Sequence, residues 1–237
     1  MFYRDGRAGT LELEALVGKG LVEFPKDKQT LTELMEIATD EDSVVLDFFA
    51  GSGTTAHAVL DLNKRDGGNR KFILFQLPEP TGREDYPTIA DITKERVRRV
   101  IKKLNDEDAG KLDLGRGKKP DRGFRVFKLA ESNFTTWNAE QAKDAAGLAR
   151  QLEMHVDHIR AERTETDLLH EILLKSGFPL TTPVEVVELA GKSVHSVAAG
   201  ALLVCLDRAL TLELIRAMAA RTPGRVVCLD EGFARND

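Results

Sequence analysis

The sequence has no long apolar run. No stretch of its 237 residues approaches the roughly 20 consecutive apolar residues that cross a bilayer, which excludes a membrane-spanning helix. The first residues, Met1 to Gly6, lack the apolar core and cleavage site of a secretory signal peptide. Cysteine is scarce, and Cys205 and Cys228 both lie within apolar runs, as buried reduced thiols do. These absences predict a cytoplasmic protein with no membrane partner.

An excess of positive charge is also absent. The net charge of −5 disfavours a free-standing nucleic-acid binder, whose affinity would rest on neutralising phosphates. Basic residues do gather between Lys94 and Lys128, and those of 94–103 could follow a DNA backbone or simply form a solvated helix face. No histidine has a ligand spacing with a cysteine, so we expect no metal site.

What the sequence does contain is a strand–turn–helix–strand pattern. Residues 44–49, Val-Val-Leu-Asp-Phe-Phe, are apolar except for Asp47, as in a buried parallel strand, and a Gly-rich turn at 50–55 leads into an apolar helix that reaches Leu62. A second apolar strand follows at 72–77. This order predicts a right-handed βαβ crossover. Two helices are expected before it, at 11–17 and 31–38.

The rest of the chain has other patterns. A helix beginning at Ile89 has one apolar face, and the alternating residues 124–129 indicate a half-buried strand. Residues 140–176 have helical spacing only. Beyond Pro179 the pattern predicts a small α/β unit, in which a hairpin turns at Gly191-Lys192. The unit ends in a parallel strand pair joined by a helix, with the strands at 202–207 and 226–231 and the helix at 212–220.

The turn at 50–55 has the composition of a ligand site. A strand that leads through such a turn into a helix N-terminus points backbone N–H groups outward, and the helix dipole adds partial positive charge. Gly51 and Gly53 would let a ligand approach the backbone where a Cβ would collide. In parallel sheets such turns lie beyond the carboxyl ends of the strands, where ligands bind. His57 follows the turn, and we expect it to be structural.

Two classes of ligand fit this turn. Gly51-x-Gly53-x-x-Ala56 matches the dinucleotide pattern, which is a weak signal on its own. Asp47, just before the glycines, would repel a pyrophosphate and attract the cationic methionine part of S-adenosylmethionine. The second strand ends in Gln76 and not in the acidic residue that a nicotinamide nucleotide ribose usually finds, although an amide can also bond to ribose hydroxyls. We therefore favour S-adenosylmethionine.

The turn and its flanks resemble a known family. Residues 47–55, Asp-Phe-Phe-Ala-Gly-Ser-Gly-Thr-Thr, resemble the S-adenosylmethionine motif of amino-group DNA methyltransferases. Within them the sequence resembles the Mod subunit of type III restriction–modification systems, a β-class adenine-N6 DNA methyltransferase. The resemblance covers essentially the whole chain and continues through residues 66–73, 76–79, 89–96, 123–129 and 132–134.

This resemblance implies which residues bind the cofactor. Phe24, Pro25 and Lys26 stand where the family has a Phe…Pro-Lys-Pro segment that lines the pocket, with Asp27 in place of the second proline. The glycine motif would surround the methionine end of S-adenosylmethionine, and Gln76 the ribose. The predicted cofactor-binding set is Phe24, Pro25, Lys26, Asp47, Phe48, Phe49, Ala50, Gly51, Ser52, Gly53, Thr54, Thr55 and Gln76.

The motif that performs methyl transfer in this family is absent. Its (Asp/Asn/Ser)-Pro-Pro-(Tyr/Phe/Trp) sequence precedes the cofactor glycines, accepts the hydrogens of the adenine amine and stacks on the flipped base. Here no two prolines are adjacent, and the residues before Val44 are too few to hold that motif and a target-recognition segment. We expect no catalytic residue in this chain, which would be inactive alone.

The expected fold class is α/β, and the expected order is a Rossmann-like, parallel-sheet half-domain, a helical segment and a small C-terminal α/β unit. The predicted boundaries are 1–135 for the cofactor-binding half, 136–178 for a helical connector and 179–237 for an assembly unit. The resemblance implies three partners: double-stranded DNA (through the full-length protein), a second copy in a homodimer, and a restriction (Res) subunit. Two alternatives stay open, a non-catalytic assembly module and a dinucleotide-binding oxidoreductase domain.

Overall fold

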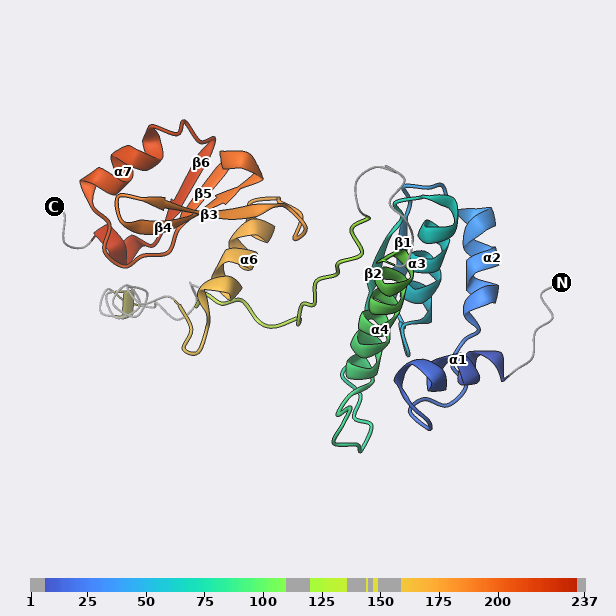
Figure 1. The fold of residues 1–237 in the computed structure, drawn as a ribbon. Coiled ribbons are helices and arrows are strands. Elements are labelled where there is room, and N and C mark those ends of the chain that lie inside the picture. The colour runs from blue at the N-terminus through green and yellow to red at the C-terminus, as the bar shows by residue number, and fades with distance from the viewer. Residues whose placement is uncertain (1–6, 110–119, 136–143, 145–146, 149–158, 234–237) are drawn as a thin grey trace. The chain divides into compact units, whose positions relative to one another are not determined.

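A computed structural model describes residues 7–109, 120–135, 144, 147–148 and 159–233 (Figure 1). The chain divides into two compact units, Met1–Val126 and Phe127–Asp237. The first unit contains a two-stranded sheet and the second a four-stranded one. Much of the helical connector expected at 136–178 lies outside the described residues, and the boundaries predicted from the sequence stay predictions.

Two helices open the first unit, as the spacing predicts. They are α1 (Ala8–Val17) and α2 (Lys28–Ala38), and each buries one face. Asp27 begins α2, because its carboxylate accepts a hydrogen bond from the amide of Thr30 at 3.1 Å. This cap satisfies one of the donors that every helix leaves unpaired at its N-terminus.

The strand–turn–helix–strand pattern is confirmed. β1 (Val44–Asp47) pairs in parallel with β2 (Lys71–Leu74), in a register that sets Val44 opposite Lys71. α3 (Thr54–Asp66) connects the two strands. Apolar residues of α3 pack against Phe72 of β2, and the strand–turn–helix junction holds the glycine turn at the carboxyl end of β1.

The prediction that the first strand is buried is wrong for one of its faces. Successive side chains of a strand point to opposite faces of the sheet. Val45 and Phe72 pack against the helices, whereas Leu46 and Ile73 are 46% and 48% exposed. Among the described residues of this unit the sheet has only two strands, with helices packed on one face, so the apolar side chains of the other face remain in contact with solvent.

A long amphipathic helix completes the first unit. α4 (Ile89–Ala109) has 21 residues, and its apolar face packs Val97 and Val100 against Ala56 and Leu60 of α3. The helix expected from Ile89 is therefore confirmed, and its first turns lie against the glycine turn.

The strand expected at 124–129 does not form. Phe124 packs onto the core made by α3 and α4, but Val126 is 52% exposed. None of these residues belongs to a ladder among the residues that the structure describes. Alternating apolar residues make a strand only where a neighbouring strand accepts and donates their backbone hydrogen bonds.

The hairpin predicted in the second unit is confirmed. β3 (Val184–Leu189) and β4 (Lys192–Val197) are antiparallel. The turn between them, Ala190-Gly191, has φ of +47° and +73°. Two positive φ values in a two-residue turn match the twist of the flanking strands.

The parallel strand pair is confirmed as well. β5 (Leu202–Cys205) and β6 (Arg225–Cys228) are parallel, α7 (Leu212–Ala219) lies between them in the chain, and the sheet order is β3-β4-β5-β6. Cys205 and Cys228 are paired in register, and Cys205 is buried whereas Cys228 is partly buried.

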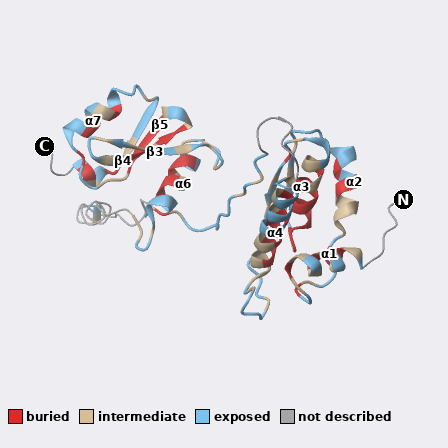
Figure 2. Cartoon of the chain, viewed as in Figure 1, coloured by how far each residue is buried: buried red, intermediate tan, exposed pale blue. Residues whose placement is uncertain are grey.

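Helices cover both faces of this second sheet. Leu202 and Val204 of β5 pack against α6 (Glu165–Lys175), while Leu203 and Cys205 of the same strand pack in the core that contains α7. All four side chains are fully buried. The second unit is thus a layered α/β/α arrangement around β5 (Figure 2).

An extended segment is anchored to α6. Glu171 accepts hydrogen bonds from Ser132 Oγ at 2.5 Å and from the Asn133 amide at 2.6 Å. Burial opposes ionisation of this carboxyl, but these bonds and Lys175 lower the pKa of Glu171 to about 2. The anchored segment also includes Phe134, which forms a bridge with Ile159.

Two properties of the described residues bear on function. None of the helices formed by these residues combines the length and the apolar character needed to cross a membrane. Nor do His, Cys, Asp and Glu side chains, within the same residues, gather in groups of three or more that could hold a metal ion.

Candidate functional site

The glycine turn takes a backbone path that requires its glycines. Gly51 has φ of +52° and Gly53 of +77°, both in the left-handed region. A Cβ on Gly53 would lie 3.1 Å from Thr93 Cγ2 and 3.3 Å from Thr93 O. Gly53 therefore allows α4 to approach the turn closely, whereas Gly51 has no atom nearer than 3.8 Å to an added Cβ.

Asp47 is fixed at the base of the turn. Its Oδ1 accepts a hydrogen bond from the Phe49 amide at 2.9 Å, and its Oδ2 accepts one from Thr55 Oγ1 at 2.5 Å. The carboxylate is thus held at the N-terminus of α3, where the helix dipole favours negative charge. Among the described residues no Lys or Arg forms an ion pair with Asp47.

Gln76 reaches the turn from the second strand. Its Oε1 accepts a hydrogen bond from the Gly51 amide at 2.7 Å, and its Nε2 donates to Leu77 O at 3.1 Å. The structure therefore brings Gln76 and the glycine motif together, as two neighbouring parallel strands end at the same edge of the sheet. The Gly51 contact uses the oxygen of Gln76 and leaves this side chain half-buried.

The segment of Phe24, Pro25 and Lys26 also lies against the turn. The carbonyl of Lys26 accepts a hydrogen bond from Thr54 Oγ1 at 3.4 Å. A Cβ on Gly9 would lie 2.4 Å from Pro25 O, so α1 packs tightly on the other side of the segment. Phe24 has φ of +50° and is 87% exposed. Backbone in this region is strained for a non-glycine residue and persists only where the surrounding structure holds it.

The aromatic residues of the motif face solvent. Phe48 and Phe49 are 63% and 88% exposed, whereas Ala50 is buried. Phe48 stacks on Phe75 with ring centroids 5.8 Å apart. These exposed rings lie at the edge of the turn, where an apolar ligand surface could cover them.

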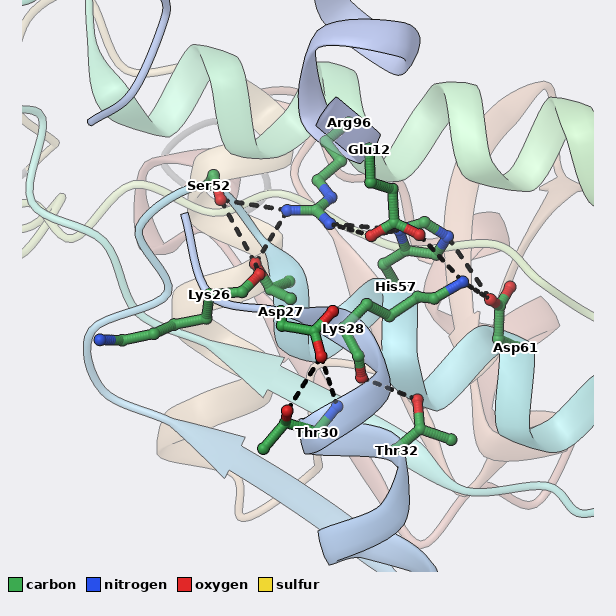
Figure 3. A network of polar contacts seen from close by, with 11 residues as sticks. Glu12, Lys26, Asp27, Lys28, Thr30, Thr32, Ser52, His57, Asp61 and Arg96 are labelled. Atoms are coloured by element: carbon green, nitrogen blue, oxygen red, sulfur yellow. Dashed lines mark hydrogen bonds and ion pairs between the residues drawn. The ribbon is translucent and has the colours of Figure 1, made fainter. Parts of the chain in front are cut away.

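Ser52 and Thr54 point into the protein. Both are 4% exposed, and both accept hydrogen bonds from Arg96 Nη1, at 3.1 Å and 2.8 Å (Figure 3). In this arrangement the side chains of the two residues contact Arg96, and Gly51 is the one residue of 50–55 that is only half-buried. Arg96 is fully buried on α4.

Arg96 belongs to a partly buried polar network that was not predicted from the sequence. Its Nη2 donates to Glu12 Oε2 of α1 at 3.1 Å, and Glu12 also pairs with Lys28 of α2 at 3.0 Å. Lys28 bonds in turn to Asp61 of α3. Although burial opposes it, the bonds to Asp61 and Glu12 raise the pKa of Lys28. Four helices are thus joined behind the turn (Figure 3).

His57 lies in the same network as a neutral side chain. Burial, with the nearby charges of Lys28, Arg96 and Lys103, lowers the pKa of His57 to about 2. Its Nδ1 lies 3.3 Å from Arg96 Nη2, and because a guanidinium only donates, this nitrogen accepts. A buried neutral histidine that accepts from Arg96 is structural, as the sequence led us to expect.

A spacing signal for Arg96 did exist in the sequence. The residue stands four positions after Ile92 and four before Val100, so it falls on the apolar stripe of α4 and not on its charged face. A charged residue on an apolar stripe is unusual and indicates a buried, paired group.

Comparison with known proteins agrees with this geometry. Residues 19–103 match the family described as DNA methylase. The match includes the Phe24 segment, the glycine turn, Gln76 and the first turns of α4. Residues 19–103 are therefore similar to DNA methylases.

Similarity to individual proteins narrows the class of DNA methylase that this chain resembles. The chain is homologous to the Mod subunits of type III restriction–modification enzymes. It is 33% identical to the EcoPI Mod subunit of Escherichia phage P1 over 96% of the chain and 33% of the relative. It is 34% identical to the EcoP15I Mod subunit of Escherichia coli over 82% of the chain and 28% of the relative. It is also 33% identical, over 48% of the chain, to the type II methyltransferase M.KpnI of Klebsiella pneumoniae, of which it covers 28%. The chain spans about a third of the length of these relatives, or less.

Proposed function

We propose that this chain is the S-adenosylmethionine-binding part of a site-specific DNA adenine-N6 methyltransferase. The observation that carries the proposal is the carboxylate of Asp47. It is held by the Phe49 amide and Thr55 at the base of a turn in which Gly51 is only half-buried and has no atom nearer than 3.8 Å to an added Cβ. A fixed negative charge beside an open turn suits the cationic amino-acid portion of S-adenosylmethionine and disfavours a diphosphate.

The residues around the turn have separate roles in this proposal. The main chain of 51–53 and Asp47 bind the methionine end, and Gln76 exchanges its bond with the Gly51 amide for one with the ribose. Phe24 and Phe49, both more than four-fifths exposed at 87% and 88%, cover the apolar surface of the adenosine. When bound, the cofactor would supply a methyl group on a sulfonium.

We propose further that the chain alone does not transfer this methyl group. Its sequence has no adjacent prolines, so the motif that accepts the amine hydrogens of the flipped base is not in it. DNA binding, a homodimer and a restriction subunit are proposed for the full-length protein, and an assembly role for the C-terminal unit. Homology to Mod subunits supports them.

Calorimetry with S-adenosylmethionine and, separately, with NAD tests the proposal. We expect the first to bind and the second not to. Asp47→Asn should weaken S-adenosylmethionine binding about 10- to 100-fold, the loss expected for one hydrogen bond or contact to a charged group. Asp42→Asn is the matched control, because Asp42 lies before the other end of β1 and is exposed. It should bind as the unaltered chain does.

Other outcomes decide against the proposal. Binding of NAD would make the chain a dinucleotide-binding domain, and binding of neither compound would favour an assembly module. Incubation with labelled S-adenosylmethionine and duplex DNA tests the second claim. Methyl transfer by this chain alone would show that the missing motif is not needed.

A further inference from the structure

Two side chains on one turn of α4, Thr93 and Arg96, donate hydrogen bonds to the glycine turn. Thr93 Oγ1 donates to Gly51 O at 2.5 Å, and Arg96, three residues further on, donates to Ser52 and Thr54. Residues three apart lie on the same helix face, so both side chains reach the turn together. Gly53 lies between these contacts, 3.1 Å from Thr93 when a Cβ is placed on it.

The guanidinium of Arg96 that contacts the turn is buried and charged. Its side chain is 0% exposed, and Glu12, at 3.1 Å, supplies the opposite charge. Within the described residues Arg96 Nε has no hydrogen-bond partner. A buried donor without a partner destabilises the fold, so this arginine is a costly way to fill the space. Its two terminal nitrogens, by contrast, make all the contacts with the turn, Glu12 and His57.

We propose that Arg96 is a positioning residue for the cofactor, which holds the main chain of the glycine turn in its binding geometry. The inference rests on the proposed function. Arg96 holds the hydroxyls of Ser52 and Thr54 inward on either side of Gly53, and so fixes the path of the main chain next to Gly51, the residue of 51–53 that is only half-buried. Arg96 itself has no exposed surface and does not touch the ligand.

The geometry explains why arginine suits this position. A planar guanidinium presents several donors in a fixed fork and can hold two hydroxyls and a carboxylate at once. Lysine keeps the charge but carries a single nitrogen on a flexible stem. Arg96→Lys should therefore preserve the pairing with Glu12 and lose the simultaneous hold on Ser52 and Thr54.

Two measurements on the full chain test this proposal. In the absence of ligand, amide hydrogen exchange of residues 50–55 should become about 10-fold faster in Arg96→Lys, while exchange at Leu60 and Leu62, buried further along α3, stays within two-fold. Calorimetry should then show about 10-fold weaker binding of S-adenosylmethionine, a change of about 1.4 kcal/mol. Arg98→Lys is the matched control, because Arg98 is on the same helix with its side chain 57% exposed. It should alter neither measurement.

Each outcome is decisive. Unchanged exchange at 50–55, or equal acceleration there and at Leu60, would mean that Arg96 only supports the fold. If the unaltered chain binds S-adenosylmethionine and Arg96→Lys binds it equally well, the positioning role is wrong while the proposed function stands. If the unaltered chain does not bind it, the proposed function is wrong, and with it the role of Arg96 in cofactor binding.

A second pair of variants guards against misfolding of Arg96→Lys. Ser52→Ala and Thr54→Val remove the hydroxyls that Arg96 holds and leave Arg96 with Glu12. Each should accelerate exchange of the turn and weaken S-adenosylmethionine binding in the same direction by a smaller factor, about 3-fold. No effect from either variant would contradict the proposal.

Discussion

The two sheets of this protein bury their strands to different extents. In the second unit α6 and α7 cover opposite faces of the sheet, and every side chain of β5 is buried. In the first unit helices cover one face of β1 and β2, and Leu46 and Ile73 on the other are about half exposed, at 46% and 48%. Helices thus cover both faces of the second sheet but, among the described residues, only one face of the first.

The two units also differ in the polar side chains that they bury. The second unit has apolar cores on both sides of its sheet. The first unit places Arg96 and His57 among its fully buried or nearly buried side chains, at 0% and 3% exposed. Buried polar networks cost stability unless they are fully paired, and they are retained where geometry matters. The second unit thus packs apolar residues on both faces of its sheet, whereas the first buries Arg96 and His57 beside its glycine turn.

The largest expected difference concerns matched leucines on the two sheets. Leu202→Ala removes a fully buried side chain from β5 and should lower the free energy of unfolding of the second unit by about 2–5 kcal/mol. Leu46→Ala, on the open face of β1, should cost the first unit less than about 1 kcal/mol. Urea unfolding followed by residue-resolved NMR measures each unit separately. Equal losses would show that the open face is covered in solution.

The next difference concerns matched glycines. Gly53→Ala should destabilise the first unit by about 2–3 kcal/mol, because it combines left-handed strain with crowding against Thr93. Gly191→Ala has similar φ, +73°, but nothing within 4 Å of the added Cβ, so the second unit should lose about 1 kcal/mol. The same urea experiment decides. If Gly53→Ala costs no more than Gly191→Ala, the contact with α4 is not tight.

A difference of about the same size should appear on acidification. His57 has a pKa of about 2 in the folded state, so below pH 6.5 only the unfolded chain binds a proton there. Stability of the first unit therefore falls as the pH drops through 6.5, by about 2 kcal/mol at pH 5. Glu171, with a pKa of about 2 instead of 4.5, makes the second unit lose stability only below pH 4.5.

Urea midpoints measured at pH 7, 6 and 5 check this order. His57→Asn should make the first unit insensitive to pH between 6.5 and 5, even if it is less stable throughout. Glu171→Gln should leave the pH dependence of the stability of both units unchanged between pH 6.5 and 5. A first unit that keeps its stability down to pH 5 would show that His57 is protonated in the folded state.

Local patterns in the sequence were enough to predict most of the fold. The βαβ crossover, the hairpin at Gly191 and the parallel strand pair all depend on short-range periodicity and on turn residues, and all are confirmed. The failures concern partners distant in the chain. The run at 44–49 looks fully buried, and 124–129 looks like a strand, because a sequence does not show whether a helix or a strand lies beside them.

Some features of the candidate site could likewise be predicted from the sequence, and others could not. The left-handed glycines, the approach of Gln76 and the nearness of Lys26 to the turn follow from motif and strand order. Arg96 was not assigned because its contacts with Glu12 and Thr54 join residues 84 and 42 positions apart in the chain. Whether the predicted residues bind S-adenosylmethionine is a prediction for the calorimetric test.

The anchoring of Ser132 and Asn133 by Glu171 has a practical consequence for shortened chains. A recombinant second unit that begins at residue 136 would retain α6 and the entire sheet, yet Glu171 would lose both partners and keep only Lys175. Its titration would then move toward that of an ordinary glutamate, and the acid tolerance of the domain would shrink. Expression should start at or before residue 127, so that the extended segment with Ser132 and Asn133 is made together with α6, which binds it.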